Sequence, residues 1–151
     1  MIITCSDTRI AETDGSGQLI QKLLKDQGHT VVEYHLVKDD PAQIQLWIAR
    51  AMTNEAVQAL IINGGTGISR RDSTFEAVDA MLEKRLPGFG EIFRLLTYQE
   101  MGSPAIMSRA TAGIIKGRCI FSIPGSEHAV KTAMEKLILP ELGHLVQQLS
   151  K

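Results

Sequence analysis

The segment from Asn63 to Asp72 has the residue types and spacing best suited to binding an anion. Gly64, Gly65 and Gly67 remove three side chains where an apolar run meets a helical pattern, so backbone N–H groups can approach a phosphate or carboxylate. The segment is not a Walker A loop, because no Gly-Lys-Ser/Thr follows, and Arg70 stands where a Rossmann motif has its third glycine. Phosphate or carboxylate binding is therefore predicted, with a tight structural turn as the alternative.

Charged side chains extend the chemistry of this segment. Arg70 and Arg71 are cationic donors suited to a phosphate, and Asp72 is a carboxylate suited to Mg²⁺ bound to that phosphate. Asp39 and Asp40 are a second pair of candidate carboxylates, earlier in the chain. The alternatives are a helix cap for Asp72 and for Asp40, and a solvated surface for the two arginines.

The elements that must position these residues follow from apolar periodicity, which alternates between short runs and helical stripes. Strands are predicted over Met1–Cys5, Thr30–Val37, Ala59–Ile62, Ala110–Ile115 and Cys119–Ile123. Helical stripes are predicted over 19–24, 44–51, 75–82, 91–100 and 130–149. Strands that alternate with helices imply crossover connections, so the chain is predicted to be one α/β domain, residues 1–151, with a mainly parallel sheet.

Capping and turn residues set the expected ends of these elements. Ser16 is the predicted N-cap of the first helix, and Asp40 that of the second. Leu86–Gly90 is predicted to end the third helix, and Lys116–Arg118 to form a hairpin turn. Pro140 is expected to divide the last stripe into two helices or to kink one.

Polar or charged segments follow four of the predicted strands: Ser6–Arg9, Lys38–Asp40, Asn63–Asp72 and Pro124–Ser126. In an open α/β sheet, ligands bind beyond the carboxyl ends of the strands. These four segments are therefore expected to form one rim. The alternative for any single segment is an ordinary polar loop.

Composition limits the classes of function. Sixteen basic and seventeen acidic residues give a net charge of −1, which excludes a broad basic surface for nucleic acid, and 5% aromatic residues leave little for base stacking. No stretch approaches ~20 apolar residues, so no membrane span is expected, and Met1–Cys5 does not resemble a signal peptide. Cys5 and Cys119 are expected to be reduced thiols, which favours the cytoplasm.

Several motifs resemble one protein family. Asn63–Asp72 followed by Thr74–Ala77 is similar to the signature of the MoaB/MogA family of molybdenum cofactor biosynthesis proteins, which includes the G domain of gephyrin. Further segments match the family's motifs in order: Ser6–Arg9, Pro87–Arg94, Ser108–Ala110, Ile123–Ser126 and Leu139–His144. Of these, Ser6–Arg9 and Leu139–His144 resemble the MoaB branch of the family.

The resemblance implies a fold, an activity and partners. The expected fold is a three-layer α/β sandwich with a mainly parallel central sheet, assembled as trimers or as hexamers made of two trimers. The implied activity is adenylylation of molybdopterin: its terminal phosphate attacks the α-phosphorus of Mg-ATP and releases pyrophosphate. ATP and Mg²⁺ are then co-substrate and metal, without a tightly bound prosthetic group, and the molybdate-inserting enzyme is an expected partner.

The resemblance also implies roles for particular residues. Asp72 matches the aspartate of the glycine-loop motif, and Asp39 matches the one in a short Pro-Asp-Glu-like segment, here Lys38–Asp40. Both are the implied catalytic carboxylates and Mg²⁺ ligands, with Asp40 as the alternative to Asp39. The implied substrate-binding residues are Ser6, Asp7, Gly64, Gly65, Thr66, Gly67, Arg71, Ser108, Pro124, Gly125 and Ser126.

Two other functions remain open at this point. The first is a non-catalytic protein of the same pathway that binds molybdopterin or acts as a scaffold, since a phosphate loop and apolar faces require no chemistry. The second is an unrelated enzyme with a phosphate-bearing ligand, such as a nucleotide sugar. The missing Walker and Rossmann motifs argue against the second.

Overall fold

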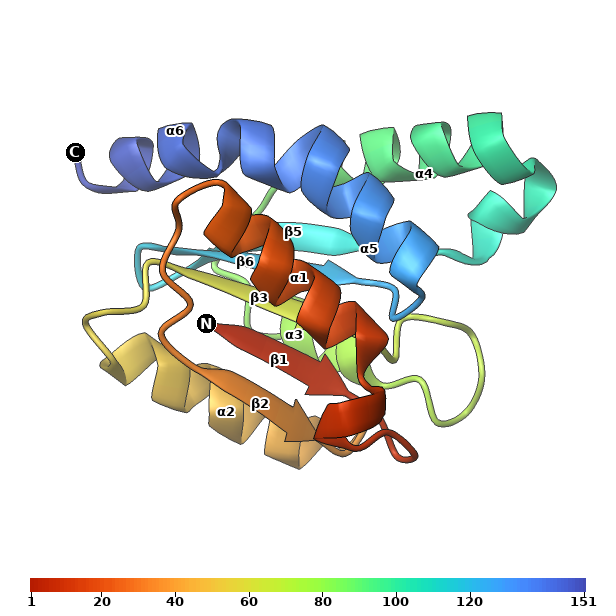
Figure 1. The fold of residues 1–151 in the computed structure, drawn as a ribbon, viewed down its shortest axis with the longest axis horizontal. Coiled ribbons are helices and arrows are strands. Elements are labelled where there is room, and N and C mark those ends of the chain that lie inside the picture. The colour runs from red at the N-terminus through yellow and green to blue at the C-terminus, as the bar shows by residue number, and fades with distance from the viewer.

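The fold is a six-stranded sheet with helices on both of its faces (Figure 1). The structure, a computed structural model, describes residues 1–151. The strands are β1 (Ile2–Cys5), β2 (Tyr34–Val37), β3 (Ala59–Asn63), β4 (Lys84–Arg85), β5 (Thr111–Ile115) and β6 (Arg118–Ile123). The helices are η1 (Ala11–Thr13), α1 (Gly15–Asp26), α2 (Pro41–Thr53), α3 (Thr74–Asp79), α4 (Pro87–Met101), η2 (Ser103–Met107), α5 (Glu127–Ala133), η3 (Met134–Ile138) and α6 (Leu139–Leu149). None of them is both long enough and apolar enough to cross a membrane.

The strand order in the sheet is β2-β1-β3-β6-β5-β4. Strands β2, β1, β3 and β6 run parallel, whereas β5 is antiparallel to both of its neighbours. The predicted α/β fold with a mainly parallel sheet is therefore confirmed, in the form of a mixed sheet. The predicted hairpin between β5 and β6 is confirmed as well.

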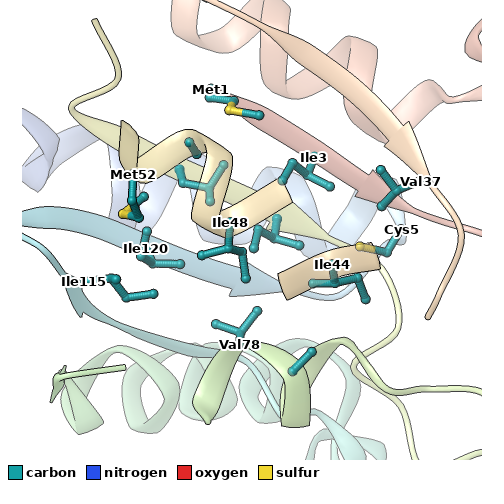
Figure 2. Close-up of a cluster of buried hydrophobic side chains, with 14 of the residues drawn as sticks. Met1, Ile3, Cys5, Val37, Ile44, Ile48, Met52, Val78, Ile115 and Ile120 are labelled. Carbon is teal, nitrogen blue, oxygen red and sulfur yellow. The ribbon is translucent and has the colours of Figure 1, made fainter. Parts of the chain in front are cut away.

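One apolar core packs α2 and α3 onto the first face of the sheet (Figure 2). It joins Ile3 and Ile120 of the strands to Ile44 and Ile48 of α2 and to Val78 of α3. All five side chains are fully buried. Burying a side chain of this size contributes roughly 1.5–3 kcal/mol, so this core holds both helices on the sheet.

A second core covers the opposite face, where α1, α4, α5 and α6 lie. Ile2 and Phe121, the strand neighbours of Ile3 and Ile120, point into it because successive strand residues face opposite sides. They meet Ile20 of α1 and Phe93 of α4. Since both faces are covered, successive residues of a central strand are apolar, as in Ala59–Ile62 of β3.

The start of α1 differs from the prediction. Asp14, not Ser16, is the N-cap, and its carboxylate accepts a hydrogen bond from the N–H of Gly17 at 3.0 Å. The Ser16 hydroxyl lies inside the fold, where it donates to Asn63 Oδ1 at 3.0 Å. The prediction was wrong because this partner on β3 is distant in the sequence and competes with the local capping role.

Other boundaries depend on proline and on tertiary pairing. Asp40 caps α2 as predicted, accepting from the N–H of Gln43 at 2.9 Å. Pro87 does not end a helix but begins α4. Proline is tolerated there because the N–H groups of the first helical turn have no acceptor within the helix. The predicted strand Thr30–Val37 shortens to Tyr34–Val37, and β4 has only two exposed charged residues, which carry no apolar pattern.

The C-terminal stripe forms two α-helices, α5 and α6, joined by the wider π-helical turn η3. Pro140 lacks the N–H that Lys136 C=O would otherwise accept from, and its ring crowds that carbonyl. The wider turn accommodates this conflict. The prediction of two helices or one kinked helix is therefore confirmed.

The hairpin turn between β5 and β6 holds a strained residue. Lys116 has φ +46° and is the one non-glycine residue with positive φ, and Gly117 follows with φ +73°. Asparagine adopts this conformation more readily than lysine and forms the favoured Asn-Gly turn.

We expect Lys116→Asn to raise the free energy of unfolding by about 0.5–1 kcal/mol, measured by urea denaturation. Lys116→Ala is the control, because it keeps the strain; an equal gain in that variant would contradict this explanation.

Candidate functional site

The candidate site lies at the sheet edge where the parallel strands end. The pairs Cys5–Val37, Thr4–Asn63 and Asn63–Ile123 are in register, so the loops after β1, β2, β3 and β6 leave the sheet side by side. Antiparallel β5 begins at the same edge, because Thr111 pairs with Ser122. The predicted rim is therefore confirmed, and the segment Ser108–Ala110 joins it.

Two glycines let the loops meet at this edge. Gly64 has φ +108°, and a Cβ there would overlap the carbonyl oxygen of Cys5. Gly65 has φ +57°, and a Cβ there would overlap the Asp39 carboxylate. Gly125 packs in turn on Gly64, with its ideal Cβ position 3.1 Å from the Gly64 Cα. Gly64 and Gly65 therefore require glycine for both conformation and space, whereas Gly125 is restricted by space alone.

Asp39 connects the loop after β2 to the start of α3. Its Oδ1 accepts hydrogen bonds from the N–H and hydroxyl of Ser73, at 3.2 and 2.8 Å, and from the Thr74 hydroxyl at 3.2 Å. Its Oδ2 lies next to Gly65. Asp40 points elsewhere, because its carboxylate caps α2. The structure therefore favours Asp39 over Asp40 as a site residue.

Asp72 lies against the same glycine loop, next to Gly67. Its Oδ2 accepts from the N–H of Ser69 at 2.8 Å, and this oxygen would lie 2.7 Å from a Cβ added at Gly67. Because Asp39 contacts Ser73, the next residue along the chain, the structure brings both predicted carboxylates to one loop.

The loop after β1 joins this arrangement through hydrogen bonds. Asp7 Oδ1 accepts from the N–H of Asp39 at 3.3 Å, and its Oδ2 lies 3.6 Å from Arg71 Nη1. The Ser6 hydroxyl accepts from the N–H groups of Thr8 and Arg9, at 3.3 and 3.1 Å, so it stabilises its own turn. Arg71 is 82% exposed and therefore lies at the rim rather than inside it.

The remaining predicted residues line the other half of the rim. Ser126 caps α5 by accepting from the N–H of Ala129 at 3.2 Å, and Pro124 and Gly125 lead into it. Ser108 Oγ is buried and has no hydrogen-bond partner. This unsatisfied hydroxyl is the kind of group that a bound ligand satisfies.

A buried polar network beneath the site was not predicted. Asp14 is fully buried and accepts from the Tyr34 hydroxyl at 2.5 Å and from Arg9 Nη1 at 3.3 Å. Arg9 Nη2 also donates to Gly125 C=O at 2.8 Å, which ties the loop after β1 to the loop after β6. Arg9 was part of a recognised motif, but nothing in the sequence indicated its partners.

The ionisation of this network follows from its surroundings. Burial alone raises the pKa of Asp14, but hydrogen bonds from Thr4, Tyr34, Gly17 and Ser16 outweigh burial, so the pKa of Asp14 lies below its usual value. Burial and the hydrogen bond to Asp14 raise the pKa of Tyr34 to about 12. The network therefore holds one carboxylate charged at neutral pH.

Arg109 is a further residue that the predicted site did not include. Its guanidinium donates to the carbonyls of Thr66, Gly67 and Asp72 and forms an ion pair with Glu76. The sequence signal that could have identified it is its place in the Ser108–Ala110 motif.

Asp39 and Asp72 are the two side chains of this loop region that could serve as ligands of a metal ion. Asp39 Oδ2 and Asp72 Oδ1 have no hydrogen-bond partner and remain available as ligands. No group of three acidic, histidine or cysteine side chains exists that would hold a metal ion by itself. Mg²⁺ needs only one or two carboxylates when substrate phosphates and water complete its shell.

A hollow of about 340 Å³ lies at the opposite edge of the sheet, near His29, Ala59 and Leu142. Most of its lining is apolar, and no aspartate, glutamate, lysine or arginine contributes to it. We therefore place the chemistry at the glycine loop rather than in this hollow.

Comparisons with known proteins agree on one family. The family described as "Probable molybdopterin binding domain" matches residues 1–144. A "Molybdenum cofactor biosynthesis protein B" from Halalkalibacterium halodurans is 54% identical over 100% of this chain and 89% of its own length, and one from Bacillus subtilis is 51% identical over 99% and 89%.

Solved structures give the same result. A crystal structure of a molybdenum cofactor biosynthesis protein B has a TM-score of 0.96 and 52% identity, and covers 99% of this chain and 93% of that one. The tungsten cofactor synthesizing protein MoaB from Pyrococcus furiosus has a TM-score of 0.87 and 36% identity, covering 99% and 95%.

The charged state of Asp14 leads to a testable dependence on pH. Because the pKa of Asp14 is depressed in the fold, its stabilising contribution is present above about pH 4 and is lost as the pH falls further. Asp14→Asn places an NH₂ group among donors, so we expect it to cost about 2 kcal/mol or more at pH 7. Urea denaturation at pH 7 and at pH 3 measures the difference between the two proteins. A difference that does not shrink at pH 3 would contradict this account.

Proposed function

The chain belongs to the molybdopterin-binding family of molybdenum cofactor biosynthesis proteins, and from this membership we propose that it adenylylates molybdopterin with Mg-ATP. The product would pass to the molybdate-inserting enzyme, which we propose as a partner. We propose the cytoplasm as the compartment, because both cysteines are buried and unpaired.

The observation that carries this proposal is the pair of carboxylates on one glycine loop. Asp39 lies against Gly65 and Asp72 against Gly67, and each keeps one oxygen free. The N–H groups from Gly65 to Ile68 have no hydrogen-bond acceptor within the protein. Free amides beside carboxylates suit a phosphate chain that arrives with its divalent cation.

The proposed reaction needs positioning more than a strong nucleophile. An oxygen of the molybdopterin phosphate forms a bond to the α-phosphorus of ATP, and the bond from that phosphorus to the pyrophosphate oxygen breaks. The loop amides would orient the two anions so that the attacking and leaving oxygens lie in line. Asp39 and Asp72 would hold Mg²⁺, which neutralises charge on the triphosphate and the departing pyrophosphate.

A second candidate function is a molybdopterin-binding or scaffold protein without catalysis. The observation that favours it is that both carboxylates already have structural partners, Asp39 at the start of α3 and Asp72 at Ser69. Calorimetry separates the two functions, because a scaffold binds molybdopterin and ignores Mg-ATP.

The family resemblance also leads us to propose a homo-oligomer, a trimer or a hexamer of two trimers. The exposed surface of α4 supports this proposal, because it carries four large apolar side chains that follow one another every three residues: Ile92, Leu95, Tyr98 and Met101. Ile106 of the following turn η2 is also exposed, at 81%. Apolar patches of this kind mark interaction surfaces.

Substitution of the two carboxylates tests the proposed chemistry. Asp39→Asn and Asp72→Asn keep a hydrogen-bond acceptor but lose the charge, so we expect each to lower the rate of adenylylation at least about 10²-fold. Asp40→Asn is the matched control, because asparagine caps a helix as well as aspartate does. The measurement is formation of adenylylated molybdopterin from molybdopterin and Mg-ATP.

Three results would contradict this proposal. An undiminished rate in Asp72→Asn or Asp39→Asn would remove that residue from the mechanism. A large loss in Asp40→Asn would exchange the roles of the two neighbouring aspartates. Absence of product with wild-type protein that still binds molybdopterin would favour the scaffold function.

The exposed apolar side chains of α4 give a separate prediction about assembly. We expect Leu95→Glu to convert the oligomer to monomers, because a carboxylate cannot be buried there without a partner. Leu46→Glu is the control, since Leu46 is 68% exposed on α2, which covers the opposite face of the sheet. Light scattering after size-exclusion chromatography measures the mass. A monomeric wild type would contradict the proposed oligomer, and an unchanged mass in Leu95→Glu would contradict assembly through α4.

A further inference from the structure

Arg109 stands just before β5 and reaches across the site edge to the glycine loop. Its Nε donates to Thr66 C=O at 3.1 Å, and its Nη2 donates to Gly67 C=O and, at 3.3 Å, to Asp72 C=O. Its Nη1 pairs with Glu76. Four of the five N–H groups of an arginine are thus engaged within the protein. Arg109 is therefore poorly placed to act as a free cation for a ligand.

The carbonyls that Arg109 binds determine where the neighbouring amides point. All peptide bonds of the chain are trans, and in a trans peptide the C=O and the N–H of the same plane point in opposite directions. Arg109 holds the carbonyls of Thr66 and Gly67, so the N–H groups of Gly67 and Ile68 must point away from the guanidinium.

The carbonyl of Asp72 shows how the C=O and the N–H of one peptide plane point to opposite sides. Asp72 C=O accepts from Arg109, and the N–H of the same peptide plane, that of Ser73, donates to Asp39 Oδ1 at 3.2 Å. An anionic oxygen therefore already occupies the side opposite the guanidinium in this plane. In the other two planes the N–H groups, those of Gly67 and Ile68, have no acceptor in the protein.

We propose that Arg109 is a positioning residue that turns the Gly67 and Ile68 amides toward a phosphate or pyrophosphate group by holding the carbonyls of their peptide planes. This inference rests on the anion site of the proposed function and deepens it. The guanidinium acts through the loop and does not contact the anion. A lysine cannot replace it, because an ammonium group lacks the planar fork that reaches three carbonyls at once.

The packing of Arg109 supports a fixed rather than a mobile role. Its side chain is only 27% exposed, and its Cζ lies 5.1 Å from the centre of the Phe75 ring. Arg71, in contrast, is 82% exposed. An arginine that is stacked and hydrogen-bonded on several sides can set the shape of a glycine-rich loop, which by itself has many accessible conformations.

The test is a ¹⁵N NMR titration of the full chain with inorganic pyrophosphate, comparing wild type with Arg109→Gln and Arg109→Lys. We expect the Gly67 and Ile68 amide signals of wild type to shift on titration. Both variants should bind pyrophosphate about tenfold more weakly or worse, as lost hydrogen bonds to a charged group predict. In both, the ligand-free loop amides should become more mobile by heteronuclear NOE.

Arg50→Gln is the matched control, because Arg50 also stacks on an aromatic ring, 4.9 Å from the Trp47 centre, but lies on α2. It should behave as wild type. Wild-type affinity in Arg109→Lys would overturn the proposal, because charge alone would then suffice. So would unchanged affinity and unchanged amide shifts in Arg109→Gln. If Arg109→Gln does not fold, the lysine variant decides the question by itself.

The outcome is separable from that of the proposed function. If wild type binds pyrophosphate but forms no adenylylated product, the enzymatic proposal fails while the role of Arg109 stands on the amide shifts. If wild type does not bind pyrophosphate, the anion site itself fails. In that case the proposed role of Arg109 fails as well, whatever the rate of adenylylation.

Discussion

The tight meeting of three strand ends is the constraint on which the rest of the site depends. Gly64 passes so close to the carbonyl of Cys5 that no Cβ fits, and Gly125 packs on Gly64 from the other side. The loops after β1, β3 and β6 are thereby held within hydrogen-bond distance of one another. Side chains from one loop can then bind the backbone of the next, as Arg9 does with Gly125 C=O.

Two arginines at this edge hold backbone carbonyls of the loops. Arg109 binds the glycine loop and Arg9 binds Gly125, while Arg71 is paired with Asp7 near the surface. The carbonyls are therefore drawn toward the guanidinium groups, and loop amides are left without acceptors. The anion site that we propose would therefore need no basic surface in a chain of net charge −1: it would consist of oriented amides and the cation that accompanies the ligand.

Much of the fold could be predicted, because the signals for it are local. Ala59–Ile62 reads as a strand covered on both faces, and Asp40 before a proline reads as a helix cap; the structure bears out both. Predictions failed where a distant partner competes with a local preference. Ser16 has the right chemistry for a cap, yet its hydroxyl is drawn to Asn63 on β3, and Asp14 caps the helix instead.

For the candidate site, the segments could be chosen from the sequence, since glycine spacing, paired acidic residues and motif order are all visible along the chain. The partner of each charged group becomes visible only in the folded chain. The Arg9–Gly125 contact spans 116 residues and the Arg109–Thr66 contact spans 43. Such contacts depend on strand order and register, which apolar periodicity does not encode, because the same periodicity is compatible with any order of the strands in the sheet.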